Sequence, residues 1–150
     1  MSFWDASAVV PLVVVHEATP RARALVQRLG RPAVWWGTLV ECASALGRLH
    51  RERKVTAAEL SASMRRLNEL ALRWEEVQPS VRLRETAMRL LRVHSLRAAD
   101  ALQVAAALEL GESRPGALKF VCLDRKLGQV GSLEGLHVVE DFGESQAKSA

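Results

Sequence analysis

The sequence feature that most constrains the fold is a series of short apolar segments, each separated from the next by a longer helix-like stretch. These segments suit buried strands and are too short for helices. Strands that alternate with helices are joined by right-handed crossovers and pair in parallel. The pattern therefore predicts an α/β fold with a mostly parallel central sheet and helices on both faces. The predicted strands are 2–5, 33–36, 74–77, 118–123 and 136–139.

Capping and stop signals set the limits of the helices between these strands. Thr56 and Ser80 are typical N-cap residues, Pro20 suits a first helical turn, and Gly30 suits a helix end. By the same reasoning Ser95 caps the most apolar helix of the chain, and a loop is predicted at 111–116. The predicted helices are 6–12, 19–30, 38–53, 57–74, 81–94 and 96–110, with a helical turn at 125–129.

Length and composition are those of one globular domain. The chain has 150 residues, of which 49% are apolar, so it can bury a core of its own. We expect a domain over residues 1–142 and a flexible tail over 143–150. No apolar run approaches the ~18 residues of a membrane span, and no basic leader marks a secretory signal. Cys42 and Cys122 are too few for a disulfide framework, so we predict a cytoplasmic protein with reduced thiols.

The acidic residues are distributed unevenly. The chain has 13 Glu but only four Asp, and three of these Asp residues stand in apolar surroundings. Asp5 and Asp124 each follow a predicted strand, and Glu41 lies one helical turn beyond another. In such sheets the carboxyl ends of parallel strands lie at one edge, where functional residues collect. We therefore expect these three acids to share one rim.

Each of these three acids also has a structural alternative. Asp5 and Asp124 are acceptable helix N-caps, whose carboxylates would accept hydrogen bonds from the following turn. Thr38 and Glu41 match a capping box, in which the glutamate reaches back to the amide of the cap residue. Neither arrangement needs a ligand, and the residues alone leave both open.

Asp100 is harder to explain structurally, because it interrupts the apolar stretch 96–108. A buried, unpaired carboxylate is costly and must be neutralised by a proton, a cation or a partner. Arg97, one turn earlier, offers an internal ion pair. A bound divalent cation is the competing solution.

Several carboxylates on one rim would raise one another's pKa unless a metal ion compensated their charge. None of the four histidines shows metal-ligand spacing, and no thiolate accompanies the acids. Hard oxygen donors of this kind favour Mg²⁺ or Mn²⁺ over zinc.

The four acids lie in segments whose residues extend the pattern. They are Phe-Trp-Asp-Ala-Ser at 3–7, Thr-Leu-Val-Glu-Cys-Ala-Ser-Ala-Leu at 38–46, Leu-Arg-Ala-Ala-Asp-Ala-Leu at 96–102 and Phe-Val-Cys-Leu-Asp at 120–124. In this order and spacing they resemble the PIN-domain family, and VapC-type toxins of bacterial toxin–antitoxin pairs in particular. The resemblance extends from residue 2 to about residue 140, and the first and third segments are its most specific parts.

The resemblance implies a PIN-like three-layer sandwich that acts as a metal-dependent endoribonuclease. It makes Asp5, Glu41, Asp100 and Asp124 the acidic, catalytic pocket. Asp5 and Asp100 are the expected main ligands of Mg²⁺ or Mn²⁺, and Asp124 completes the metal site. Glu41 is expected to position or deprotonate water, and Ser7 to bind substrate beside the first acid.

The resemblance also implies an RNA substrate, a homodimer and a cognate antitoxin that obstructs the pocket. Two features depart from the family pattern. Cys122 stands where a small hydroxyl residue is common, and the segment 127–132 is glycine-rich where an Ala-rich helix is usual. The alternative from another class is a catalytically weak PIN-like domain that acts through protein or RNA binding.

Other reaction classes lack the residues they require. A phosphotransfer receiver needs adjacent acids after its first strand, and a phosphatase of the Asp-x-Asp type is excluded by Ser7. Neither the dinucleotide-binding nor the P-loop glycine pattern occurs. Among the basic residues, contacts with an RNA backbone suit Arg48, Arg51, Arg53, Arg65 and Arg66, although a solvated helix face accounts for most of them.

Overall fold

Five short strands pair in parallel at the centre of the molecule, in the order β3-β2-β1-β4-β5. The structure is a computed structural model and describes residues 1–114 and 118–139. The central strand β1 pairs through Phe3 with Ala33 on one side and with Phe120 on the other. The predicted parallel sheet is therefore confirmed. The strands are β1 (Ser2–Trp4), β2 (Pro32–Trp35), β3 (Glu75–Val77), β4 (Lys119–Val121) and β5 (His137–Val138).

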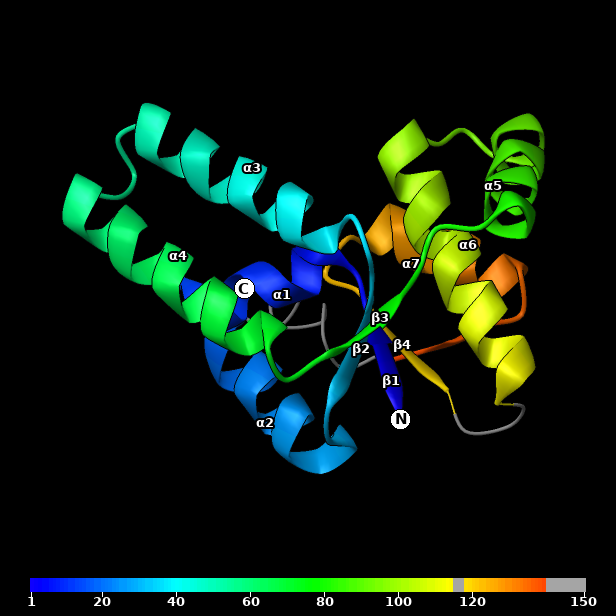
Figure 1. The fold of residues 1–150 in the computed structure, drawn as a ribbon, viewed down its shortest axis with the longest axis horizontal. Helices are drawn as coiled ribbons and strands as arrows, with labels where there is room; N and C mark the ends of the chain where they lie inside the picture. The colour runs from blue at the N-terminus through cyan, green and yellow to red at the C-terminus, as the bar shows by residue number, and fades with distance from the viewer. Residues whose placement is uncertain (115–117, 140–150) are drawn as a thin grey trace, which may run out of the picture.

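Helices cover both faces of this sheet, which makes a three-layer α/β sandwich (Figure 1). One layer holds α1 to α4 and the other holds α5 to α7. Thr56 and Ser80 cap their helices as predicted, because each side chain accepts a hydrogen bond from the amide of the residue three positions later. The helices are α1 (Ala6–Val13), α2 (Thr19–Leu29), α3 (Thr38–Arg51), α4 (Ala57–Ala71), α5 (Val81–Val93), α6 (Ala98–Ser113) and α7 (Arg125–Leu133).

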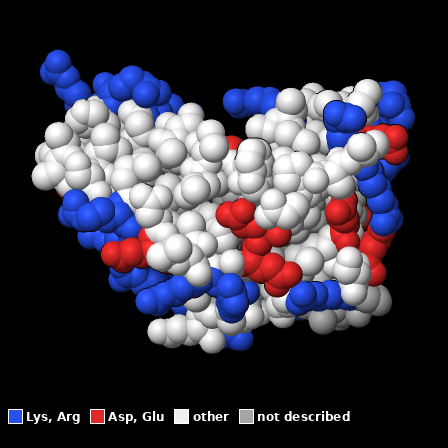
Figure 2. Space-filling view, viewed as in Figure 1, with Lys and Arg blue, Asp and Glu red and all other residues white. Residues whose placement is uncertain are grey.

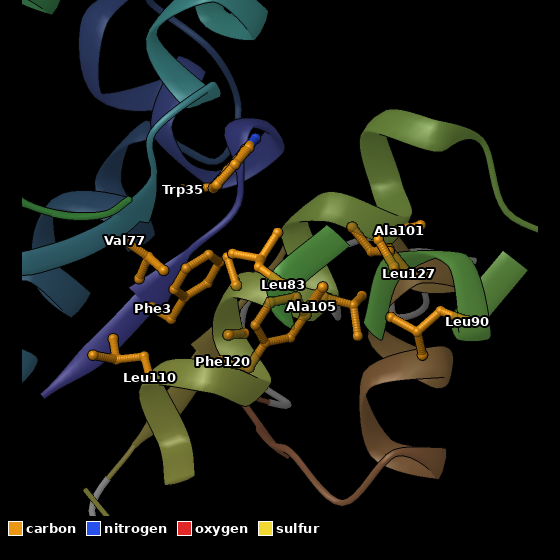
Figure 3. Close-up of a cluster of buried hydrophobic side chains, with 14 of the residues drawn as sticks. Phe3, Trp35, Val77, Leu83, Leu90, Ala101, Ala105, Leu110, Phe120 and Leu127 are labelled. Atoms are coloured by element: carbon orange, nitrogen blue, oxygen red, sulfur yellow. The ribbon is translucent and has the colours of Figure 1, made fainter. Parts of the chain in front are cut away.

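The alternation of side chains along β1 builds two separate cores. Phe3 points to the α5–α7 side, where its ring centroid lies 6.0 Å from that of Phe120 (Figure 3). Trp4 points to the opposite side and packs among apolar residues of α1 to α4. Successive residues of a strand face opposite ways, so one apolar segment serves both layers. Both side chains are fully buried, and each burial stabilises the fold by about 2–3 kcal/mol.

The glycine-rich segment after Asp124 forms a helix of nine residues, whereas the sequence predicted only a turn at 125–129. Its glycines allow close packing. A Cβ on Gly131 would lie 3.2 Å from a ring carbon of Phe120, and one on Gly128 would lie 3.5 Å from Val138. The helix thus forms despite its glycines, and Gly131 leaves little room for a larger side chain beside Phe120.

Helix α6 begins at Ala98, later than predicted, and continues to Ser113 through part of the predicted loop. Arg97 occupies the N-cap position, and Ser95 lies outside the helix. Before this segment His94, the C-cap residue of α5, is extended, and its Nε2 lies 2.7 Å from Glu134 Oε1.

Both cysteines are buried and free, as predicted, and burial raises the pKa of each thiol above its usual value. No described helix combines the length and the apolar character needed to cross a bilayer. The predicted tail, residues 143–150, lies outside the described residues.

Candidate active site

The four predicted acids come from four elements that end or begin at the same edge of the sheet. Asp5 follows β1, Asp124 precedes α7, and Glu41 and Asp100 lie in the first turns of α3 and α6. We call this edge, with Asp5, Glu41, Asp100 and Asp124, the notch. In Figure 2 the surface is hollowed at the top, between the two helical layers.

Each of three acids at the notch has its pKa raised by the charge of another acid of the four. The charge of Glu41 raises the pKa of Asp5, that of Asp100 raises the pKa of Glu41, and that of Asp124 raises the pKa of Asp100. Burial is the larger cause in each case. The fold therefore brings together, as electrostatic neighbours, acids that are up to 119 residues apart, from Asp5 to Asp124.

Asp5 is the most buried of the four, with 4% of its surface exposed. Desolvation raises the pKa of its carboxyl group to about 7, although the hydroxyl of Ser7 and the amides of Ser7 and Ala8 act in the opposite direction. Asp5 occupies the N-cap position of α1, and its side chain makes no capping hydrogen bond of normal geometry, although the amides of Ser7 and Ala8 oppose the effect of burial on its pKa. The helix-cap alternative therefore accounts for only part of the surroundings of this carboxyl group.

Ser7 connects the first acid to the last. Its hydroxyl donates a hydrogen bond to Asp5 Oδ1 at 2.6 Å and accepts bonds from the amides of Leu123 at 3.0 Å and Asp124 at 3.3 Å. One donor and two acceptor positions are all that a serine hydroxyl offers. The three contacts therefore use its full hydrogen-bonding capacity to join the start of α1 to the end of β4.

Glu41 is half-buried and is held by a residue that the sequence did not single out. Gln103 Nε2 donates hydrogen bonds to Glu41 Oε2 at 2.7 Å and to Thr38 Oγ1 at 3.0 Å. The capping-box alternative is wrong, because Gly37 is the N-cap residue of α3 and no side chain caps this helix. Thr38 is fully buried and faces Gln103 instead.

Asp100 is also half-buried, and among the described residues no ion pair joins it to Arg97. Burial and then the charge of Asp124 raise the pKa of its carboxyl group, while Arg97 and Lys126 lower it more weakly. The ion pair with Arg97 is therefore not formed, and the pKa of Asp100 stays above its ordinary value.

Asp124 is the one exposed member of the four, and its structural alternative is confirmed. Its Oδ1 accepts a hydrogen bond from the amide of Leu127 at 3.2 Å, which caps α7. Cys122 reinforces the same turn, since its Sγ donates to the carbonyl of Asp124 at 3.0 Å. A capping carboxylate still has a second oxygen for another contact.

The residues of the notch fit a hard divalent cation in chemical type. All four are carboxylates, and a cation would relieve the desolvation cost that Asp5 carries. Across residues 1–114 and 118–139, however, no three acidic, histidine or cysteine side chains converge tightly enough to form a complete ion site. The carboxylates are therefore suitable ligands for such a cation by type, but the described side chains do not form a complete coordination site.

Gln103 is the residue that the sequence analysis missed. It is 1% exposed, and its Oε1 is the single buried side-chain oxygen or nitrogen without a hydrogen-bond partner in the described part of the chain. The available signal was a lone polar residue inside the apolar stretch 101–108.

Comparison with known proteins agrees with this architecture. The family model described as "PIN domain" matches residues 3–132. No functionally curated protein matches the chain.

Three solved structures illustrate the similarity. PAE2754 from Pyrobaculum aerophilum is 23% identical with a TM-score of 0.63, over 93% of this chain and 83% of that one. FitAcB from Neisseria gonorrhoeae is 15% identical with a TM-score of 0.63, over 92% and 96%. VapBC2 from Rickettsia felis, bound to a DNA fragment from its promoter, is 12% identical with a TM-score of 0.64, over 92% and 96%. At these identities the likeness concerns the fold.

Proposed function

Because this chain belongs to the PIN-domain family, we propose that it is an endoribonuclease dependent on Mg²⁺ or Mn²⁺ and the toxin of a toxin–antitoxin pair. The observation that carries the proposal is the chain of four coupled acids at the notch. Asp5 lies at its buried end with a raised pKa, and no ion pair joins it to a basic side chain within residues 1–114 and 118–139. Such an arrangement costs stability and is typical of a functional site.

In this proposal the acids divide into two roles. Asp5, Asp100 and Asp124 hold the metal ion, while Glu41 positions the attacking water and accepts its proton. When bound, the ion supplies Lewis acidity toward the scissile phosphate and lowers the pKa of water.

Ser7 keeps Asp5 and the start of α7 at a constant separation through its three hydrogen bonds. Its predicted contact with substrate would require one of these bonds to be exchanged. We therefore assign Ser7 primarily to the positioning of the acids.

The decisive experiment is cleavage of single-stranded RNA with Mg²⁺ or Mn²⁺, with and without a chelator, by wild type and by Asp5→Asn. Metal-dependent cleavage by wild type alone would support the proposal. Equal cleavage by both proteins, or cleavage that survives chelation, would refute it.

The toxin role is supported by similar folds in FitAcB, in VapBC2 and in a structure titled "Toxin-antitoxin complex" from Klebsiella pneumoniae, at a TM-score of 0.57. Expression of this chain alone should arrest growth of its host, and Asp5→Asn should relieve the arrest. Co-expression of a neighbouring short reading frame, as the cognate antitoxin, should relieve it as well. Growth unaffected by the wild-type chain would refute the toxin role and leave the nuclease proposal intact.

We further propose a homodimer located in the cytoplasm. Support for the dimer comes from exposed apolar side chains on α5, with Met88 at 54%, Leu91 at 41% and Val93 at 63% exposure. Sedimentation equilibrium of wild type and of Leu91→Glu would test the dimer.

A further inference from the structure

We infer that Gln103 is a positioning residue, which holds the Glu41 carboxylate toward the acids of the notch through the 2.7 Å hydrogen bond from Nε2. The hydrogen bond itself is seen in the geometry of the structure. Its effect on catalysis rests on the proposed function.

The first argument is how Gln103 is held. Both Nε2 protons are used, one by Glu41 Oε2 and one by Thr38 Oγ1, and each acceptor lies on α3. An amide that donates twice to one neighbouring helix has a defined orientation. Turning it over would place Oε1 against the Glu41 carboxylate, where two acceptors repel.

The second argument is that Gln103 is a poor choice for stability. Its Oε1 is buried without a partner, which carries a desolvation penalty, and the residues after it on α6 are apolar and buried. Leucine or methionine would fill a similar volume without that penalty. The benefit of glutamine therefore lies in the two hydrogen bonds it gives to α3, of which the shorter one reaches the carboxyl group of Glu41.

The test compares wild type with Gln103→Leu and Gln103→Met. We expect a melting temperature close to that of wild type, because removal of the unpartnered Oε1 offsets loss of the donor to the buried Thr38 Oγ1. Mn²⁺ affinity and KM for RNA should be unchanged. The kcat should be about 10- to 100-fold lower, less than the roughly 10²–10⁴-fold that a whole proton-transfer group contributes, because Glu41 itself remains. Thr38→Val is the matched control, because it removes the other acceptor and leaves the bond to Glu41; its kcat should fall much less. A wild-type kcat in Gln103→Leu, or a melting temperature that falls as kcat falls, would overturn the inference.

A second measurement is independent of activity. In protein labelled with ¹³C at glutamate carboxyl groups, the Glu41 resonance is assigned by its loss in Glu41→Ala. It should move in Gln103→Leu and stay in place in Thr38→Val. An unmoved resonance would overturn the inference, even if RNA cleavage failed in wild type and refuted the proposed function.

A separate observation concerns Trp36, from which we propose that the outer face of α3 receives single-stranded RNA, with one base stacked on this indole. Trp36 is 52% exposed, whereas Trp4, Trp35 and Trp74 are at most 7% exposed. It directly follows β2 at the edge of the sheet that carries the acids. This proposal also rests on the proposed function, since it names how the same site takes its substrate.

Trp36 is exposed and yet held in place. Its amide donates to the carbonyl of Val77 at 3.0 Å, and its ring meets Trp35 edge-on with centroids 6.3 Å apart. Gly37 permits this packing, because a Cβ there would lie 2.5 Å from Trp35 Nε1. A fixed aromatic face is a low-entropy platform for an unpaired base.

The charges that follow along α3 favour RNA as the occupant. Val40, Ser44, Arg48 and Arg51 are exposed at steps of three or four, so they share one face of the helix. From Val40 to Arg51 this face runs about 16 Å at 1.5 Å per residue. This face of α3 is therefore apolar at Val40, near the acids, and cationic at Arg48 and Arg51, toward the end of the helix. Such an order suits a stacked base followed by the phosphate backbone of the same strand.

Tryptophan fluorescence tests this placement without catalysis. In the presence of chelator, a single-stranded oligoribonucleotide should quench wild-type emission saturably, and Trp36→Leu should remove the quench and weaken binding about 10-fold. Duplex RNA, whose bases are already stacked, should bind both proteins equally. Leu72→Ser, at an apolar side chain directly after α4 that is 84% exposed, is the matched control and should bind as wild type does.

Equal affinity of Trp36→Leu and wild type for the single strand would overturn this placement. So would a Trp36→Leu protein that keeps its RNA affinity and loses only an antitoxin partner. If wild type binds no RNA at all, the proposed function fails with it; if wild type cleaves RNA while Trp36→Leu binds normally, only the placement fails.

Discussion

The acids at the notch and the acids on the α5–α7 side have opposite surroundings. Glu134, at the end of α7, accepts two hydrogen bonds from Arg89 at 2.9 and 3.2 Å and lies 2.7 Å from His94 Nε2. These partners lower the pKa of Glu134. Asp5 has no ion pair with any described basic side chain, and burial raises its pKa to about 7.

The difference shows where the chain gives up stability. On the α5–α7 side Arg82 also pairs with Glu112, so basic side chains accompany the acids and join helices. At the notch, like charges are placed next to one another and partly buried, which is unfavourable unless a cation binds. Stability and function thus use the same carboxyl groups in different settings.

The largest expected effect is on activity. Asp100→Asn should lower RNA cleavage by about 10³-fold or more, because a neutral amide replaces a metal-binding carboxylate. Glu134→Gln is the matched control at a paired acid, and its kcat should stay within about twofold. Comparable losses in both variants would mean that the notch has no special role.

The second effect is on stability without divalent ions. Asp5→Asn should raise the free energy of unfolding by about 2–4 kcal/mol at pH 8, because it removes a buried charge. In wild type the folded state keeps a proton between the ordinary pKa of 3.8 and about 7, so stability should fall as pH rises through this window. Urea titrations from pH 4 to 8 measure both, and a flat profile in wild type would contradict the assigned cause.

The third effect sharpens the contrast through metal addition. Mn²⁺ at 100 times its Kd should stabilise wild type by about 2.7 kcal/mol. Asp5→Asn and Asp100→Asn should gain much less, while Glu134→Gln should gain as much as wild type. Thermal unfolding with and without Mn²⁺ checks this. Equal gains in stability for all four proteins would mean that the ion binds outside the notch.

The smallest effect concerns the paired side. Glu134→Gln should lower the free energy of unfolding by about 1–2 kcal/mol at pH 7, discounted because Arg89 is 44% exposed. Because the pKa of Glu134 is lowered by folding, its contribution is present above its ordinary pKa and is lost as pH falls through the lowered value. Stability of the variant equal to wild type at pH 7 would show that the contact is energetically neutral.

Particular residues show how far sequence reasoning reaches. The short apolar strands that contain Phe3 and Phe120 and the caps at Thr56 and Ser80 are local patterns, and they were predicted correctly. The start of α6 at Ala98 was not, because Ser95 suits an N-cap by residue type and yet lies outside the helix. The length of α7 was missed because Gly131, which disfavours a helix locally, is needed where the Phe120 ring approaches.

The same division holds for the candidate site. The sequence identified four acids whose positions after strands and in first helical turns bring them to one edge. It left open whether each acid caps a helix, pairs with arginine or stands unpaired. The structure answers differently for Asp5, Glu41 and Asp124, because capping depends on hydrogen-bond geometry that residue type does not specify.

By itself, then, the sequence determined the order of strands and helices and the identity of the acids, since periodicity and residue chemistry are properties of the local chain. Only the tertiary structure decided that Asp5 is buried with no ion pair to any basic residue that the structure describes, that Gln103 donates a hydrogen bond to Glu41 and that Trp36 is exposed. Burial and hydrogen bonding are set by residues distant in sequence, and they determine the pKa and the orientation of each group at the notch.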